Sequence, residues 1–166
     1  PRRQDRQVQI MPTFSEQVTM LYYYPHMRPE IMDALIDVGY KGIIIVGTGL
    51  GHVNRELYPA LKRARDEGVS VFMTLQTLWG YSQMFVYDTG RDMLALGVVP
   101  LGNMLPEVAW VKLGWVLGQT EDPVQVKDLM LTPVNDDITQ REPYNGYLVY
   151  QGGVPEVEDF VRNFRK

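Results

Sequence analysis

The run Gly47-Thr48-Gly49-Leu50-Gly51-His52 is the part of the sequence best suited to hold a ligand. It stands between a predicted buried strand and a predicted helix, and glycines at such a turn let the backbone bend sharply. A ligand could then approach the helix N-terminus, where free N–H groups favour anions. The carboxyl ends of strands in an open α/β sheet are also the usual place for ligands. A purely structural strand-to-helix turn explains the same glycines equally well.

Two phosphate-binding motifs are excluded for this run. Its spacing is G-x-G-x-G rather than G-x-G-x-x-G, and the next predicted strand ends at Thr74-Leu75-Gln76 without the acid that would hold a ribose. The Lys-Ser/Thr pair of a Walker loop is missing as well. A ligand at this turn would therefore be bound neither by a dinucleotide fingerprint nor by a Walker loop.

The side chains that could break bonds do not form a recognisable set. The chain has 2 histidines, His26 and His52, each following a predicted strand, and no third ligand stands at metal-binding spacing. We therefore expect no metal; the two histidines either form hydrogen bonds at a ligand-facing edge or are simply exposed at the surface. No Gly-x-Ser-x-Gly elbow is present, and no base is evident beside a hydroxyl. Asp88, Asp92 and Glu107 are expected to cap helices and complement helix dipoles rather than form a catalytic pair.

The elements around the glycine run predict a parallel sheet with helices on both faces. Residues 18–24, 43–46 and 69–75 are apolar or β-branched and predict strands, the first one buried on both faces. Between them, two stripes at helical spacing predict two helices, the first ended by Gly39 and the second by Gly68. The stripes are Ile31, Ala34, Leu35, Val38 and Leu57, Ala60, Leu61, Ala64. Alternation of strand and helix is typical of an α/β fold with right-handed crossovers.

The second half of the chain predicts a loop over 76–88, a short helix through Leu96 capped by Asp88 or Thr89, and a brief strand over 98–100. Asn103 is the expected N-cap of a helix over 104–118, which is apolar nearly all round and should be buried on more than one face. Further helices are predicted near 122–131 and over 155–164.

Composition narrows the function classes. The net charge of the 166 residues is −4, which argues against a polybasic nucleic-acid-binding surface. The chain has no cysteine, which excludes disulfides, thiol catalysis and Cys-ligated zinc. No apolar run approaches the roughly 20 residues of a membrane span, and no signal peptide is evident. We expect a cytoplasmic protein.

We expect three parts in the chain: a linker or truncated segment over 1–13, an α/β domain over 14–134 and a C-terminal extension over 135–166. The polar start at Pro1 suggests that the chain belongs to a longer protein.

Several strings together resemble a known family. They are the run from Gly42 to Val53, the segments 77–80 and 86–92, Met104-Leu105-Pro106-Glu107 with the residues 112–118, and the tail 151–157. In combination they are similar to the C-terminal part of the D subunit of the archaeal glutamyl-tRNA(Gln) amidotransferase, an L-asparaginase-like family. The resemblance runs from about Phe14 onward and implies the C-terminal domain of the asparaginase/glutaminase fold, a three-layer α/β arrangement of flavodoxin-like type.

The resemblance also implies a function. In that family, threonine nucleophiles on an N-terminal domain release ammonia from glutamine or asparagine, and an ATP-dependent complex with the E subunit uses it to convert Glu-tRNA(Gln) to Gln-tRNA(Gln). The nucleophile motifs are not found in this sequence, so we expect no catalytic residue and no cofactor in this chain, and no activity from it alone. The implied partners are the N-terminal domain, a second copy in a homodimer, and the amidotransferase's E subunit, with tRNA reached only through the complex.

The resemblance implies a positioning role for a few residues at the strand ends. In asparaginase-like enzymes, the loop that corresponds to residues 49–52 contributes to the active site of a neighbouring subunit. The expected substrate-positioning residues are Gly49, Gly51, His52, Gln76 and Tyr87. A free-standing small-molecule-binding or regulatory α/β module, which uses the same glycine edge for an anionic effector, is the alternative.

Overall fold

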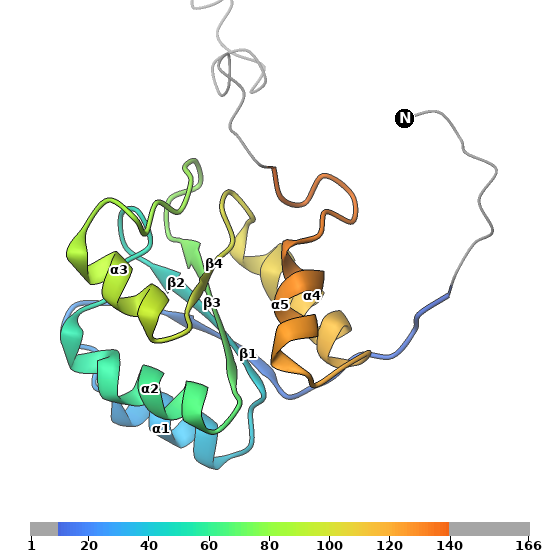
Figure 1. Ribbon diagram of the computed structural model, residues 1–166, viewed down its shortest axis with the longest axis horizontal. Helices are drawn as coiled ribbons and strands as arrows, with labels where there is room; N and C mark the ends of the chain where they lie inside the picture. Colours follow the sequence, from blue (N-terminus) through green and yellow to red (C-terminus); the bar gives the residue numbers. More distant parts are fainter. Residues whose placement is uncertain (1–9, 140–166) are drawn as a thin grey trace, which may run out of the picture.

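The computed structural model describes residues 10–139, which form one four-stranded parallel sheet covered by five helices (Figure 1). The strands lie in the order β1 (Val18–Tyr22), β2 (Gly42–Gly47), β3 (Ser70–Leu75) and β4 (Val99–Pro100). The helices are α1 (Glu30–Asp37), α2 (Tyr58–Asp66), α3 (Asp88–Ala95), α4 (Pro106–Leu117) and α5 (Pro123–Leu131). Each strand joins the next through a helix, as parallel pairing requires.

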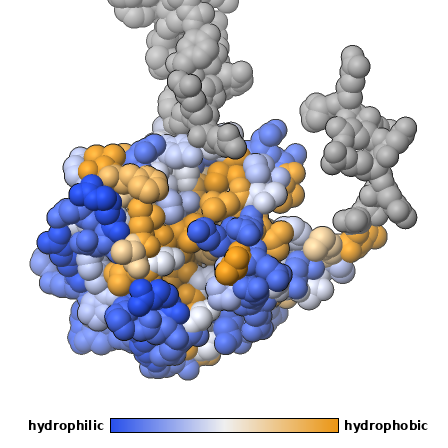
Figure 2. All heavy atoms as spheres, viewed as in Figure 1, coloured by the Kyte–Doolittle hydropathy of each residue, from blue (hydrophilic) through white to orange (hydrophobic). Residues whose placement is uncertain are grey.

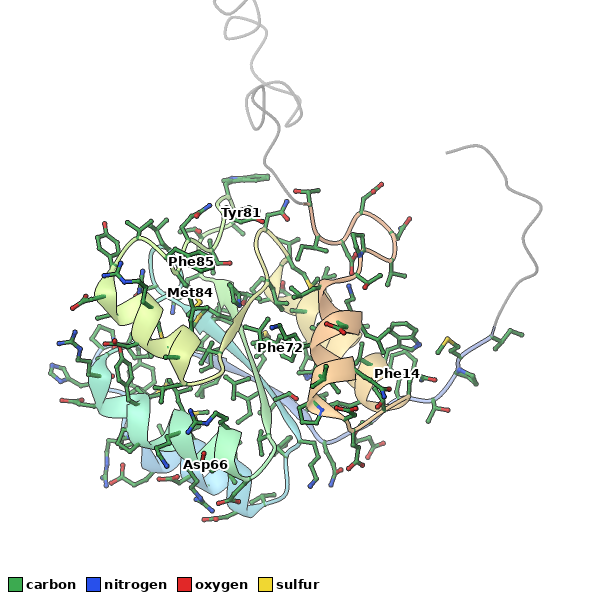
Figure 3. The ribbon with its side chains drawn as sticks, viewed as in Figure 1. Phe14, Asp66, Phe72, Tyr81, Met84 and Phe85 are labelled. Atoms are coloured by element: carbon green, nitrogen blue, oxygen red, sulfur yellow. The ribbon has the colours of Figure 1, made fainter. Side chains whose placement is uncertain are left out.

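Three layers result, and the predicted fold class is confirmed. Ile43 and Ile45 face the layer of α1, α2 and α3, whereas Ile44 and Phe72 face α4 and α5 on the other side (Figures 1 and 3). Successive side chains of a strand point to opposite faces, so a central strand covered on both faces must be apolar at every position. β2 is buried throughout for this reason.

The first strand is less buried than the sequence predicts. β1 ends at Tyr22 rather than at residue 24, and only Val18 of its five residues is fully buried. Within residues 10–139, β1 is an edge strand that pairs with β2 alone, so no described strand lies along its outer side. The expectation of burial on both faces was therefore wrong for this strand.

The first helix turns a different face to the sheet from the one predicted. Met32 and Ile36 are its buried residues, while Ile31 and Val38 of the predicted stripe are exposed. Leu35, partly buried, belongs to both stripes. The helix also lies beside α2, where Arg63 forms ion pairs with Asp33 and Asp37 of α1. For α2 the predicted stripe is correct, because all four of its residues are buried.

Two predicted caps were wrong. The N-cap of α3 is Tyr87, and Asp88 lies inside the first turn, where its carboxylate accepts a hydrogen bond from the Thr89 amide. The N-cap of α4 is Leu105, because Asn103 instead forms two hydrogen bonds with Thr139. Asp122 is a genuine side-chain cap for α5 and accepts from the Val124 amide.

The second half of the chain contains the predicted loop and short strand. Residues 76–87 form a loop without a strand, and the predicted strand over 98–100 appears as β4. The helix predicted over 155–164 lies outside the described residues. Within residues 10–139, no helix combines the length and apolarity that crossing a bilayer demands.

Candidate functional site

The candidate site lies at the carboxyl edge of the sheet, where three chain segments meet. Residues 48–54 follow β2, Gln76 follows β3, and residues 82–89 lead into α3. In parallel strands these ends share one edge, so residues far apart in sequence come together there. Tyr81, Met84 and Phe85 lie at this edge in Figure 3.

The glycine run folds into a closed turn rather than a helix N-terminus. The amides of Gly51 and His52 donate to the Thr48 carbonyl, and the Thr48 amide donates to the His52 carbonyl, each over a distance of 3.0 Å. A 3₁₀ turn at Arg55–Leu57 follows, and α2 begins only at Tyr58. Of the two readings of the glycines, a ligand-binding helix start and a purely structural turn, the first is not supported: the run does not begin a helix, and three of its amides are bonded within the turn.

Two glycines in the turn are required by its geometry. Gly49 has a φ of +55° and Gly51 a φ of +97°, both in the region that side chains rarely adopt. A Cβ at Gly51 would lie 3.0 Å from the Met73 side chain, whereas one at Gly49 would meet nothing within 4 Å. Gly51 is thus constrained by backbone and packing together, and Gly49 by backbone alone.

His52 is held by the segment that leads into α3. Its Nδ1 lies 3.2 Å from the Thr89 hydroxyl oxygen, and its ring meets that of Tyr87 edge-on at a centroid distance of 5.3 Å. Burial lowers the pKa of His52 below the ordinary value for histidine. The imidazole is therefore neutral near pH 7 and can donate from one nitrogen and accept at the other.

Three polar side-chain atoms at this edge are buried and have no hydrogen-bond partner within residues 10–139. They are His52 Nε2, Asn54 Oδ1 and Ser82 Oγ. Buried polar groups are normally paired, because an unsatisfied one costs about 1–3 kcal/mol. All three lie in the glycine turn, just after it, or in the loop that packs on Gly51. Hydrogen-bonding capacity is therefore concentrated around this turn.

Gln76 holds the strand ends together. Its side-chain amide donates to the carbonyls of Tyr23 and Val46, and its backbone N–H donates to the Gly47 carbonyl at 3.0 Å. These bonds connect the segments that follow β1 and β3 to the end of β2. Gln76 therefore supports the position of the glycine turn.

Of the predicted site residues, His52 and Tyr87 are in direct contact, and Gly51 immediately precedes His52. Sequence reasoning missed Thr89 as a partner of His52, as well as Asn54 and Ser82. It also found no base beside a hydroxyl, yet the Thr89 hydroxyl is within hydrogen-bonding distance of His52. The 37 residues that separate this pair leave no local signal.

Large apolar side chains surround the turn and remain exposed. Figure 2 shows such side chains gathered over the loop that leads into α3. The exposed members at this edge of the sheet are Tyr22, Tyr24, Leu78, Trp79, Phe85, Val86 and Tyr87. A contiguous exposed apolar patch commonly marks an interaction surface. Among the described residues, no group of three or more His, Asp or Glu side chains could hold a metal ion.

The model of the glutaminase/asparaginase C-terminal domain family matches residues 17–130 of this chain. The chain belongs to this family. The match covers the whole sheet and all but the last residue of α5, so the site described above lies inside the matched region.

Curated relatives confirm the more specific resemblance to the amidotransferase's D subunit. The D subunit of the glutamyl-tRNA(Gln) amidotransferase of Metallosphaera sedula is 53% identical over 79% of this chain and 30% of its own length. The corresponding D subunit of Thermococcus kodakarensis is 45% identical over 89% of this chain and 33% of its own length. The chain thus spans about one third of the length of these relatives.

Solved structures show the same fold. The thermostable L-asparaginase from Thermococcus kodakarensis superposes with a TM-score of 0.79 at 28% identity, covering 85% of this chain and 43% of that one. L-asparaginase I from Vibrio cholerae gives a TM-score of 0.74 at 27% identity, covering 81% and 41%. Both likenesses concern less than half of the asparaginase chain.

Proposed function

We propose that this chain is the C-terminal domain of an amidotransferase subunit that releases ammonia from glutamine or asparagine. In this proposal the ammonia converts Glu-tRNA(Gln) to Gln-tRNA(Gln), and the chain positions substrate and forms a dimer. The family match and the names of the relatives support the amidotransferase part. The proposed partners are the E subunit of the amidotransferase and, only through the complex with it, tRNA.

The observation that carries the positioning role is the placement of His52. The imidazole is uncharged, held on one side by Thr89 and Tyr87, and retains hydrogen-bonding capacity at a buried Nε2. It stands on a turn in which the Thr48, Gly51 and His52 amides are bonded internally, and these bonds fix the backbone that carries the imidazole. Such preorganisation lowers the cost of orienting a polar substrate.

Bond breaking is assigned to another part of the protein. Amide hydrolysis needs an activated hydroxyl, a base and a group that orients the base. The Thr89 and His52 pair supplies the first two, but no carboxylate among the described residues contacts the far nitrogen of His52. The turn amides of Thr48, Gly51 and His52 are already bonded and so are not free to stabilise an oxyanion. We assign the nucleophile to threonines of an N-terminal domain.

The exposed aromatic edge supports the proposed dimer. Tyr22, Phe85 and Tyr87 are each about half exposed or more, next to the glycine turn. Aromatic side chains of this kind are enriched at protein interfaces. A second copy that covers this edge would bring its own active-site residues to His52.

The test compares two histidine variants in the full-length protein with glutamine as substrate. His52→Ala removes one hydrogen-bonding group, which is worth about 0.5–1.5 kcal/mol, so KM should rise roughly 3- to 10-fold with kcat nearly unchanged. His26→Ala is the control, because His26 is an exposed histidine near the same edge. The 166-residue chain alone should show no glutaminase or asparaginase turnover.

Two results would contradict the proposal. Turnover by the isolated chain would place the nucleophile here, and Thr89→Val would then identify it by abolishing that turnover. Equal KM values for both histidine variants and the unmodified protein would remove His52 from substrate positioning.

A further inference from the structure

A second apolar surface lies on the side of α4 that faces away from the sheet. Val108, Val111 and Trp115 are spaced along one stripe of this helix, and Val111 is 52% exposed. Together with Phe14 and Val134 they line a groove of about 620 Å³. Figure 3 shows Phe14 beside α4 and α5. The groove is separate from the glycine turn.

The wall of the groove is fixed by a buried ion pair. Lys112 Nζ lies 2.7 Å from an Asp137 carboxylate oxygen and donates to the Thr132 carbonyl at 2.7 Å. The side chains are only 5% and 12% exposed. Burial alone would raise the pKa of Asp137, but the bonds from Lys112 and from the Val134 amide outweigh it and lower that pKa. Residues 132–137 are therefore held against α4.

The chain leaves this wall at the N-terminal end of α4. Thr139 is bonded to Asn103 through both its amide and its hydroxyl, and Asn103 stands three residues before Pro106, the first residue of α4. The C-terminal segment therefore starts beside one end of the groove.

We infer that residues 155–164 dock into this groove as an amphipathic helix. Val157, Phe160, Val161 and Phe164 stand at i, i+3, i+4 and i+7, so a helix would place them on one apolar stripe. Ten helical residues span about 15 Å and the twelve of α4 about 18 Å, so the lengths match. Burying four such side chains stabilises the docked state.

Length and charge favour an antiparallel arrangement of this segment on α4. Residues 140–154 reach up to about 50 Å when extended, which is ample to run the length of α4 before the segment turns back. The segment then ends in Arg162, Arg165 and Lys166 next to Glu107, in the first turn of α4. Glu107 forms no ion pair with any residue in the range 10–139. The basic end and this carboxylate are complementary.

The test uses engineered cysteine pairs, because the chain has no cysteine of its own. Val111→Cys is combined with Phe160→Cys or Val161→Cys on the apolar stripe, and with Asp159→Cys on the opposite side as the control. A disulfide needs Cα atoms within about 7 Å. At least one stripe pair should form an intrachain disulfide at least 5-fold faster than the control pair.

Each other outcome overturns the inference. Equal rates for all pairs mean that the segment does not occupy the groove. A disulfide that joins two chains means that the groove holds a second copy instead.

A second measurement guards against a folding defect in the cysteine variants. Val111→Asp should speed tryptic cleavage at Arg162 and Arg165 by roughly 10-fold, because the charge opposes docking of the apolar stripe. Val124→Asp is the matched control, since Val124 is an exposed valine on α5 that does not line the groove. Equal cleavage of both variants and of the unmodified chain would also overturn the inference.

Discussion

Replacing Gly51 by alanine should damage the glycine turn far more than the same change at Gly49. Both positions have positive φ, but only Gly51 lacks room, since a Cβ there would lie 3.0 Å from Met73 Cγ and 3.5 Å from the Met84 and Ser82 side chains. Strained backbone costs about 1–3 kcal/mol and overpacking about 1–3 kcal/mol. The reduced freedom of the unfolded chain returns about 0.4–1 kcal/mol. We expect Gly51→Ala to lower the free energy of unfolding by about 2–4 kcal/mol.

Gly49→Ala carries the backbone cost only, so we expect a loss of about 1 kcal/mol. Urea denaturation followed by circular dichroism measures both variants against the unmodified chain. With an m-value of about 1–3 kcal/mol/M, the two midpoints should differ by roughly 1 M. Equal midpoints, or a lower midpoint for Gly49→Ala, would show that packing against Met73 does not hold the turn.

Three further changes test other parts of the structure. Lys112→Met leaves the largely buried Asp137 carboxylate without its ion-pair partner, so the free energy of unfolding should fall by about 2–4 kcal/mol. The control is Lys127→Met on the exposed side of α5, which should change the free energy of unfolding by less than about 0.5 kcal/mol. The pKa of His52 is lowered in the folded state, so the unfolded state binds more protons and the free energy of unfolding should decline as pH falls below about 6.5. His52→Gln should remove this part of the pH dependence. An NMR titration that places the pKa of His52 at or above about 6.5 would contradict the prediction. Gln76→Glu places a carboxylate against the Tyr23 and Val46 carbonyls, so the free energy of unfolding measured by urea denaturation should fall by about 1 kcal/mol or more. An unchanged free energy of unfolding would show that these two hydrogen bonds do not stabilise the fold.

The order of strands and helices could be predicted because it depends on local composition. β2 is a continuous apolar run flanked by glycines, β3 is apolar except for Ser70 and Thr74, and the buried side of α2 matches its stripe at every position. A central strand and its crossover helix have few alternatives once the sheet is parallel.

The buried side of α1 could not be predicted in the same way. Ile31, Leu35 and Val38 fit helical spacing, and so do Met32, Leu35 and Ile36. The helix is too short for the two stripes to differ in pattern. The choice is made by the direction of the crossover from β1 and by the contacts of Arg63 with α1, neither of which is local in sequence.

The sequence predicts where the glycine turn lies along the chain but not which hydrogen bonds it forms. The glycines mark the turn, yet the amides of Thr48, Gly51 and His52 are bonded to the carbonyls of Thr48 and His52 rather than left free. Asn103 illustrates the same limit, because a good N-cap residue by type bonds to Thr139 instead. Competing partners distant in sequence decide which hydrogen bonds form, and the sequence alone does not rank them.

These corrections bear on the substrate-positioning role proposed for the turn. A helix N-terminus would favour an anion through backbone dipoles, and that mode would suit the alternative of a free-standing module for an anionic effector. A closed turn with a neutral imidazole favours a polar, hydrogen-bonding group instead. In the proposed function, a polar group of glutamine or asparagine would suit such a site, whereas a simple phosphate would find, among the described residues, no cationic side chain paired with His52 and no free amide at Thr48, Gly51 or His52. We therefore keep recognition of a polar, hydrogen-bonding group at this turn as part of the proposal, ahead of the alternative of an anionic effector.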